Sequence, residues 1–220
     1  MCVLLLTGCE GPYSTLHAAG PAARTTALLW WCMALFATSV LIGVIVVWSL
    51  ALKREAMDER SARRVARRLI IGGGILLPSL SILVLLAFGI PLGHSMLPIF
   101  ASEREVLHIE VTARQWQWDV YYPAQNLRLS NELHIPSGEP VLIHLRARDV
   151  VHAFWVPRLA GKLDAIPGHT TTLKLEADEP GLYHGQCAEF CGLQHARMYF
   201  TVEAHEVADF AAWLQAQERP

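Results

Sequence analysis

The chain has 220 residues, a formal net charge of −2 and a mean hydropathy of +0.31, and 53% of its residues are hydrophobic. This hydropathy excludes an ordinary protein that is soluble throughout, and a slightly acidic chain is not expected to bind nucleic acid. No internal repeat or low-complexity tract is present, so membrane-spanning and globular parts are expected side by side.

Residues 1–27 form an N-terminal outer segment. Within it, Leu6-Thr7-Gly8-Cys9 looks like a bacterial lipoprotein processing box, which would leave Cys9 lipidated after cleavage. Turn-forming residues follow, as expected for a tether. The stretch before Cys9 has no basic residue and is shorter than a signal segment requires, so we expect the true start to lie upstream.

Two uncharged runs come next, at residues 28–52 and 69–93. At 1.5 Å per helical residue, each is long enough to cross a hydrocarbon core of about 30 Å. Gly72-Gly73-Gly74 and Pro78 lie in the second run, where a helix in a membrane tolerates them. The alternative of buried core helices fits poorly, and residues 28–93 are predicted to form a transmembrane helical hairpin.

The loop predicted between the two spans, residues 53–68, is strongly basic, with seven basic residues in sixteen. The positive-inside rule therefore places it in the cytoplasm and both termini outside. Residues 94–220 form the predicted outer domain, and the chain from residue 92 onward has sixteen acidic and ten basic side chains, a net charge of −6. That acidity is either a solvated surface or a docking face for a basic partner.

The sequence of the outer domain predicts β-strands. Apolar and polar residues alternate with a period of two in several short stretches: 106–113, 116–122, 140–147, 182–184 and 198–202. Turn residues such as Pro136-Ser137-Gly138 and Pro180-Gly181 separate them. The pattern predicts an antiparallel sandwich or barrel. Residues 205–217 predict one C-terminal helix, with Val207, Phe210, Ala211 and Leu214 on its packing side.

Four soft or borderline metal ligands lie within twelve residues: Cys187, Cys191, His195 and Met198. Thiolate, imidazole and thioether together suit copper better than a hard cation. Two thiolates can bridge two copper ions, whereas a single blue-copper ion needs one. A further nitrogen ligand is then required, and His152 is the best candidate, because it lies at a strand end and aromatic residues follow it.

Other interpretations of these residues remain open. Cys187 and Cys191 could form a disulfide, although the ring would be small and His195 would be unexplained. Zinc accepts a Cys2His2 set, and Met198 could be a core residue of a strand. The remaining histidines of the β-region are expected to be ordinary strand or surface residues: His108, His134, His144 and His184.

Residues 185–198 closely resemble the dinuclear copper A motif of cytochrome c oxidase subunit II. Residues 149–157, 162–168 and 115–118 resemble other segments of that family, and the paired spans match as well. The resemblance extends over about residues 25–204. It implies two N-terminal transmembrane α-helices followed by an all-β, cupredoxin-like sandwich domain.

The resemblance also implies roles for single residues. Cys187 and Cys191 would bridge two coppers, and His152 and His195 would each bind one. Met198 and the backbone carbonyl of Glu189 would be weak ligands. The Glu189 side chain would reach a magnesium ion shared with the catalytic subunit, and Trp116, otherwise a core aromatic residue of a strand, would receive electrons.

By resemblance, the chain is a subunit of a cytochrome-c oxidase in a bacterial inner membrane, with its copper domain in the periplasm. It would accept electrons from cytochrome c and pass them to haem in catalytic subunit I, in a complex that also contains subunit III. There oxygen would be reduced to water, coupled to proton translocation. Three alternatives remain: a quinol-oxidising relative, which lacks the copper ligands; a nitric oxide reductase subunit; and a membrane-tethered copper carrier.

Overall fold

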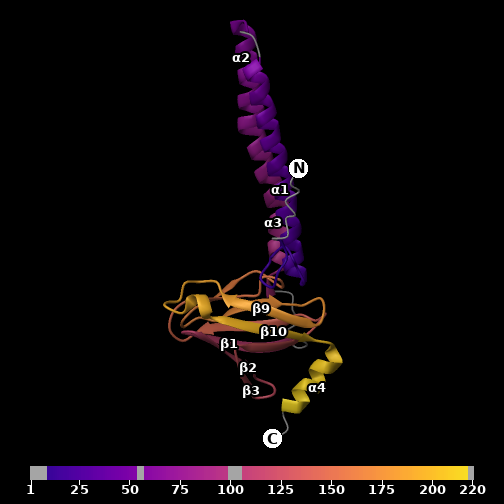
Figure 1. Ribbon diagram of the computed structural model, residues 1–220, viewed down its shortest axis with the longest axis vertical. Helices are drawn as coiled ribbons and strands as arrows, with labels where there is room; N and C mark the ends of the chain where they lie inside the picture. Colours follow the sequence, from indigo (N-terminus) through magenta and orange to yellow (C-terminus); the bar gives the residue numbers. More distant parts are fainter. Residues whose placement is uncertain (1–8, 54–56, 99–105, 218–220) are drawn as a thin grey trace, which may run out of the picture. The chain divides into compact units, whose positions relative to one another are not determined.

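The computed structural model describes residues 9–53, 57–98 and 106–217 (Figure 1). They form two compact units: Leu29–Met96 is one, and Met1–Leu28 together with Leu97–Pro220 is the other. Most of the lipoprotein-like box, residues 6–8, lies outside the described residues. Cys9 is described as a partly buried free cysteine.

The first unit is helical. Helix α1 spans Pro21–Lys53, and a second helical run consists of α2 (Glu59–Arg68), the π-helical segment η2 (Leu69–Leu76) and α3 (Leu77–Ser95). The three-glycine sequence lies in the π-helical segment. Both runs are long and apolar enough to cross a membrane, and their apolar side chains are exposed, as contact with lipid requires. The two predicted spans are present as helices.

The connector differs from the predicted loop at 53–68, because residues 59–68 are helical. Asp58 caps this helix by accepting a hydrogen bond from the Ser61 N–H at 3.0 Å. One turn later, Glu59 and Arg63 form an ion pair at 2.8 Å with the i,i+4 spacing that supports a helix. The basic charge therefore lies mainly on a helix, while residues 54–56 of the predicted loop lie outside the described residues.

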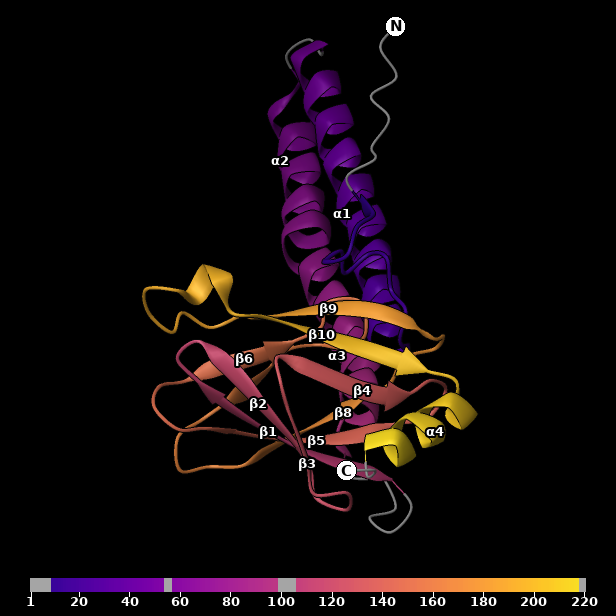
Figure 2. The ribbon, with the colours of Figure 1, turned by 60° about the horizontal axis from the view of Figure 1, so that its bottom comes forward.

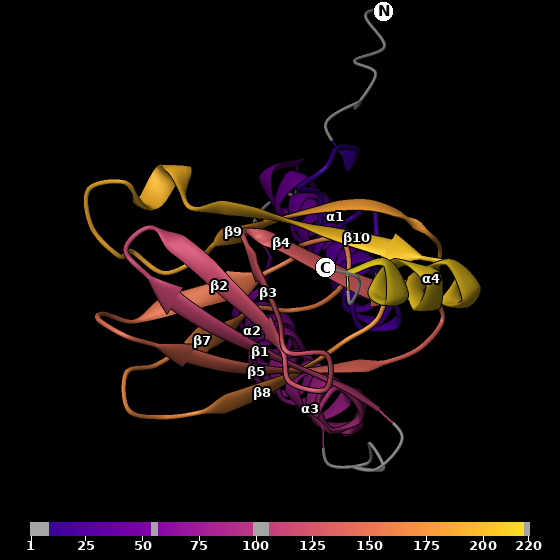
Figure 3. The ribbon, with the colours of Figure 1, turned by 90° about the horizontal axis from the view of Figure 1, so that it is seen from below.

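The second unit is a sandwich of two five-stranded sheets, stacked face to face (Figures 2 and 3). The first sheet has the order β3-β2-β1-β5-β8, with β1 at Leu107–Arg114, β2 at Gln117–Tyr122, β3 at Leu127–Ser130, β5 at Val141–Ala147 and β8 at Thr171–Leu175. The second has the order β4-β10-β9-β6-β7, with β4 at Glu132–Pro136, β10 at Tyr199–His205, β9 at Gly181–Cys187, β6 at His152–Trp155 and β7 at Leu163–Ala165.

The strand prediction is confirmed, but the sheets are mixed and not purely antiparallel. Strand β1 runs parallel to β5, and β4 runs parallel to β10. Alternation reports which face of a strand is buried but not which strand lies beside it. The alternating residues meet in one core between the sheets, whose largest fully buried members include Trp118, Tyr122, Phe154, Ile109 and Leu145.

The segment leading into α1 is bound to the sandwich. The Ala19 N–H donates to the Arg158 carbonyl at 2.7 Å, and the Ala19 carbonyl accepts from the Asp178 N–H at 2.8 Å. Arg24 and Asp178 add an ion pair at 2.8 Å. Any side chain at Gly20 would collide with the backbone of Leu159, so glycine is required there. These contacts make residues 19–24 part of the β-unit.

The chain's last described element is α4 (Val207–Gln217), which contacts β4 and β10. Phe210 is buried, and Trp213 and Leu214 pack against the core. Val207, predicted to lie on the packing side, is exposed, because a helix starting there directs Trp213 toward the sheet instead. The C-terminal helix therefore covers the outer face of the second sheet.

Candidate metal centre

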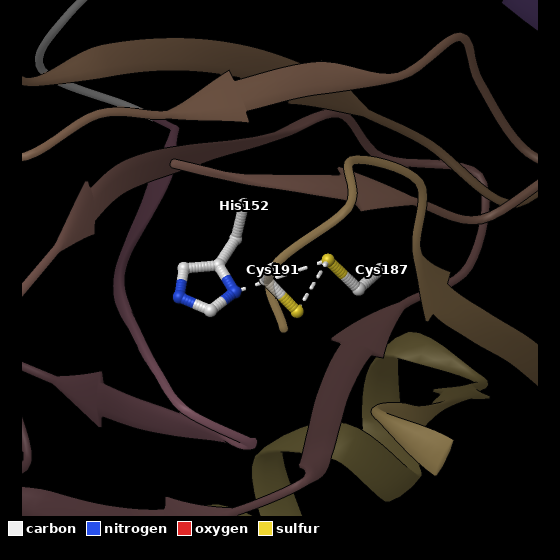
Figure 4. Close-up of side chains that lie close together, drawn as sticks. All are labelled: His152, Cys187 and Cys191. Atoms are coloured by element: carbon white, nitrogen blue, oxygen red, sulfur yellow. Dashed lines mark hydrogen bonds between the residues drawn. The ribbon is translucent and has the colours of Figure 1, made fainter. Parts of the chain in front are cut away.

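Two strands and one loop bring the predicted ligands together. Strand β6 begins at His152 and pairs with β9, which ends at Cys187, with Phe154 opposite Cys187. Residues 188–198 then form the loop that returns into β10 and supplies Cys191, His195 and Met198. Figure 4 shows His152, Cys187 and Cys191 pointing toward one another. Residues far apart in the sequence thus meet at one end of the second sheet.

The two sulfurs are the centre of the cluster. Cys187 Sγ and Cys191 Sγ lie 3.8 Å apart as free thiols, so the structure contains no disulfide at this pair. Cys187 Sγ lies 3.9 Å from His152 Nδ1, and Cys191 Sγ lies 3.6 Å from His195 Nδ1. Met198 Sδ is 3.7 Å from Cys191 Sγ. Each sulfur therefore has its own imidazole, and the thioether stands beside one of them.

The cluster is shielded from water. The exposed fraction is 0% for His152, 1% for Met198, 2% for Cys191 and 5% for Cys187. His195 is partly exposed and closes the site on the loop side. Such burial keeps bulk water away from any ion held there and lowers the local dielectric constant.

Backbone hydrogen bonds fix the loop. The Cys187 N–H donates to the Met198 carbonyl at 3.0 Å, and the Ala188 N–H donates to the Ala153 carbonyl at 3.0 Å. From the turn between β1 and β2, Gln115 Nε2 donates to the Cys191 carbonyl at 2.7 Å. The ligands are therefore held in place from three different parts of the sandwich.

Asp149 orients the imidazole of His152. Its Oδ1 lies 2.9 Å from His152 Nε2, and its two oxygens also accept the N–H groups of Val150 and Gln115, each at 2.7 Å. A carboxylate on one ring nitrogen leaves the other nitrogen free to bind a metal, as in carboxylate–histidine–metal triads. His152 Nδ1 is thus the nitrogen directed at the sulfurs.

Changing Asp149 to asparagine is expected to lower copper affinity by about ten- to a hundredfold, the usual cost of losing such a partner. The oxygen of the asparagine amide carries no negative charge, so it holds the imidazole less firmly than the Asp149 carboxylate does. Competition with a copper chelator on the full-length chain measures the affinity. Asp209→Asn, on exposed α4, is the matched control and should leave it unchanged. Equal affinities in all three proteins would contradict this role for Asp149.

The two thiols differ in acidity. Burial alone would raise the pKa of Cys187, but hydrogen bonds from His152 and from the backbone of Glu189 and Ala153 lower it to about 6. Burial, followed by the negative charge of Cys187, raises the pKa of Cys191 to about 12. At neutral pH the metal-free cluster therefore carries one thiolate, and a metal bound by both sulfurs must displace the second proton.

The donor set fits copper. Thiolate and thioether sulfur select copper, zinc or iron–sulfur clusters, and imidazole suits copper and zinc. A closed structural zinc site needs four ligands, whereas five side chains converge here: His152, Cys187, Cys191, His195 and Met198. A sixth donor is the Glu189 carbonyl, which lies 3.2 Å from Cys187 Sγ.

Glu189 presents its two ends in different directions. Its carbonyl faces the sulfurs, while its carboxylate lies 3.9 Å from the Lys162 ammonium group and is about half exposed. The carboxylate therefore points away from the two sulfurs, the direction that the family resemblance implies.

Trp116 lies in the turn between β1 and β2 and not within a strand. It is partly exposed and packs against the core, and its Nε1 has no hydrogen-bond partner among the described residues. A methyl group added at Gly192 in the metal loop would lie 3.5 Å from Trp116 Cζ2. The indole therefore lies between the surface of the sandwich and the loop that carries the ligands.

Two supporting residues are missing from the predicted site, Asp149 and Gln115. Asp149 is separated from His152 by two residues, a spacing that could have suggested a carboxylate–imidazole pair. Gln115 gave no such signal, because its contact with Cys191 joins residues 76 positions apart.

Comparison with known proteins places the chain in a family. The family model for the periplasmic domain of cytochrome c oxidase subunit II matches residues 120–205. Quinol oxidase subunit 2 of Bacillus cereus is 30% identical over an alignment of 227 positions. The alignment covers 97% of this chain and 76% of that protein. The chain belongs to the subunit II family of haem–copper oxidases. Members of this family normally bind copper, and the family's periplasmic domain corresponds to the sandwich, which confirms the predicted fold class.

Other members of the family match shorter parts. Cytochrome c oxidase subunit 2 of Alkalihalophilus pseudofirmus is 44% identical over 109 residues, covering 50% of this chain. That match spans about a third of the relative's own length, 32%. The crystal structure of the periplasmic domain of subunit II of cytochrome oxidase from Bradyrhizobium japonicum is 29% identical and covers 51% of this chain and 94% of that chain, with a TM-score of 0.49. The two apolar helices and the periplasmic-type domain together fit a membrane protein.

Proposed function

We propose that this family member is the subunit through which electrons enter a cytochrome-c oxidase in a bacterial inner membrane. It accepts them from cytochrome c at a dinuclear copper A centre in the periplasm and passes them to haem in the catalytic subunit. Oxygen is reduced to water there, coupled to proton translocation. One observation carries the proposal: two buried sulfurs lie 3.8 Å apart, and each has its own imidazole.

Each residue of the cluster has its own proposed role in holding the metal. Cys187 and Cys191 would hold both ions, His152 and His195 would each hold one, and Met198 and the Glu189 carbonyl would be weak ligands. When bound, the copper pair supplies a one-electron carrier. The buried ligands and the hydrogen-bonded loop exclude water and resist movement, which keeps the structural change on electron transfer small.

Two further residues have proposed roles around this centre. Trp116 is the point at which electrons reach the domain, which is supported by its position between the surface and the metal loop. The Glu189 carboxylate binds a magnesium ion shared with the catalytic subunit, in exchange for its distant Lys162 partner. A hard cation prefers such an oxygen ligand.

The copper loop also offers a contact for the catalytic subunit. Phe190 is 77% exposed and Leu193 is 93% exposed, both within the loop that carries the ligands. Large apolar side chains gathered at a functional loop mark an interaction surface. We assign this surface to catalytic subunit I, and we also propose a subunit III in the complex and a lipid on Cys9.

Quinol oxidase subunits are among the relatives, so the electron donor needs a separate argument. A quinol-oxidising relative has no use for copper ligands in this domain. Here all of them are present, and they converge. The ligand set therefore favours cytochrome c as the donor.

Copper loading of the purified full-length chain tests this function. We expect two more copper ions per chain than a Cys187→Ser, Cys191→Ser variant binds, and a paramagnetic resonance spectrum in which one unpaired electron is shared by two copper nuclei. A four-line spectrum of a single copper, or elemental analysis that finds only zinc in well-folded protein, would overturn the dinuclear assignment. Electron transfer from reduced cytochrome c, measured against a quinol, then identifies the donor.

A further inference from the structure

A second group of metal-ligand side chains lies far from the copper loop. Ligand atoms of His134, Glu203 and His205 all lie within 4.8 Å of one another. Strand β10 begins directly after Met198 and ends at His205, which separates the two groups by about 23 Å along the strand. In Figure 2, the copper loop and α4 lie at opposite ends of β10.

The parallel pairing of β4 and β10 creates this group. Glu203 lies opposite His134 in the register, and His205 lies opposite Pro136. His134 Nδ1 is 2.8 Å from His205 Nε2 and 3.8 Å from Glu203 Oε2. Two imidazole nitrogens and one carboxylate oxygen therefore surround one point.

A carboxylate orients the central imidazole from behind. His134 Nε2 lies 2.7 Å from Glu132 Oε1, so this nitrogen carries the proton and Nδ1 presents its lone pair to the group. The arrangement matches the one in which Asp149 orients His152 in the copper site. Histidines that bind metals commonly donate their other N–H to a carboxylate in this way.

The surroundings favour a cation. The His134 side chain is 6% exposed, whereas Glu132 and Glu203 are about half exposed and leave a path from solvent. Two carboxylates beside the two imidazoles supply negative charge that a bound cation would neutralise.

We propose that His134, His205 and Glu203 bind one divalent transition-metal ion, and that zinc is the ion this set fits best. Two imidazoles and one carboxylate form a known zinc ligand set, with the fourth position left to water. The ion takes the place of the hydrogen between the two ring nitrogens, and this proton leaves for the other ring nitrogen of His205 or for solvent. The two nitrogens move apart to about 3.3 Å, as zinc–nitrogen distances of 2.0–2.1 Å require.

The indole of Trp213 covers the site. Its ring stacks on His134 with centroids 4.0 Å apart and an interplanar angle of 17°. Trp213 belongs to α4, so the helix that covers the outer face of the sheet also closes the metal site. A paramagnetic ion bound beneath this ring would quench its fluorescence at contact distance.

The test uses the full-length chain with Cys187→Ser and Cys191→Ser, which removes the thiols of the copper site. Titration with Zn²⁺ by calorimetry should show one ion per chain. Glu203→Gln and His205→Gln should each weaken binding at least tenfold, and Glu132→Gln by about ten- to a hundredfold. His144→Gln is the matched control, because His144 Nε2 also lies 2.9 Å from an imidazole nitrogen, that of His108.

Nickel gives a second measurement that does not depend on those variants. Ni²⁺ should quench part of the tryptophan fluorescence, and Trp213→Phe should remove that part while Zn²⁺ still binds. Circular dichroism of each metal-free variant checks its fold. The proposal is overturned if no ion binds, if quenching persists in Trp213→Phe, or if His144→Gln weakens binding as much as His205→Gln. Since the thiols are absent throughout, failure here leaves the copper proposal untouched.

Discussion

Replacing Cys187 by serine should abolish the shared-electron spectrum of the copper-loaded protein. The Cys187 sulfur lies between His152 Nδ1 and Cys191 Sγ, at 3.9 and 3.8 Å, so its loss removes a bridge between the two ions. A serine hydroxyl stays protonated at neutral pH and is a hard ligand that binds copper weakly. We expect one copper per chain or none, measured by elemental analysis and paramagnetic resonance.

Met198→Leu is the matched control, because leucine keeps the volume of this buried side chain and removes only its sulfur. Met198 lies beside Cys191 and not between the imidazoles. The variant should therefore retain two coppers and the shared-electron spectrum while its reduction potential shifts. If Cys187→Ser keeps the spectrum of the unaltered protein, or if Met198→Leu loses both ions, the assigned ligand roles are wrong.

Gly185→Ala should destabilise the sandwich by about 3 kcal/mol, near the upper end for overpacking a core. Gly185 lies opposite Phe200 in the β9–β10 register, and an added methyl group would overlap the Phe200 ring. That ring cannot move aside easily, because it stacks on Phe154 at 4.3 Å and meets Trp118 at 5.4 Å. Chemical denaturation of the full-length chain, followed by near-ultraviolet circular dichroism, measures the loss.

Gly161→Ala serves as the control, since a methyl group added there meets nothing within 4 Å. Its free energy of unfolding should stay within about 0.5 kcal/mol of the original. Adding Phe200→Leu to Gly185→Ala should restore part of the lost stability by making room for the methyl group. Equal stability of the two glycine variants would show that the Phe200 ring is not confined as described.

Local patterns in the sequence predicted the elements of this chain well. Two uncharged runs predicted the membrane helices, and alternation predicted the strands. The limits appear wherever a contact joins distant segments. Alternation put Trp118 and Tyr122 on the same face of a strand, but it could not show that β1 lies parallel to β5. Trp116 continued the alternation and yet lies in a turn, because the period does not mark where a strand begins.

The candidate copper site was predictable because four of its side chains lie within twelve residues of the sequence, from Cys187 to Met198. His152 could be predicted from the aromatic residues that follow it and from the family resemblance. Asp149 and Gln115 act through hydrogen bonds that only the folded backbone creates. His134 was expected to be an ordinary strand or surface residue, and His205 was named only as the start of the C-terminal helix, for the same reason. Their separation of 71 residues hides a pairing that parallel strands bring within 2.8 Å.

The parallel pairing of β4 with β10 sets the order in which the second sheet and the metal loop form. Among the described strands, β10 is the last in the sequence, yet it must lie between β4 and β9 before the second sheet is continuous. The loop that carries most of the sulfur ligands is anchored by the start of β10, through the bond between Cys187 and Met198. Under the proposed function, copper is therefore captured only after β10 has joined the sheet, which makes metal insertion a late step of maturation.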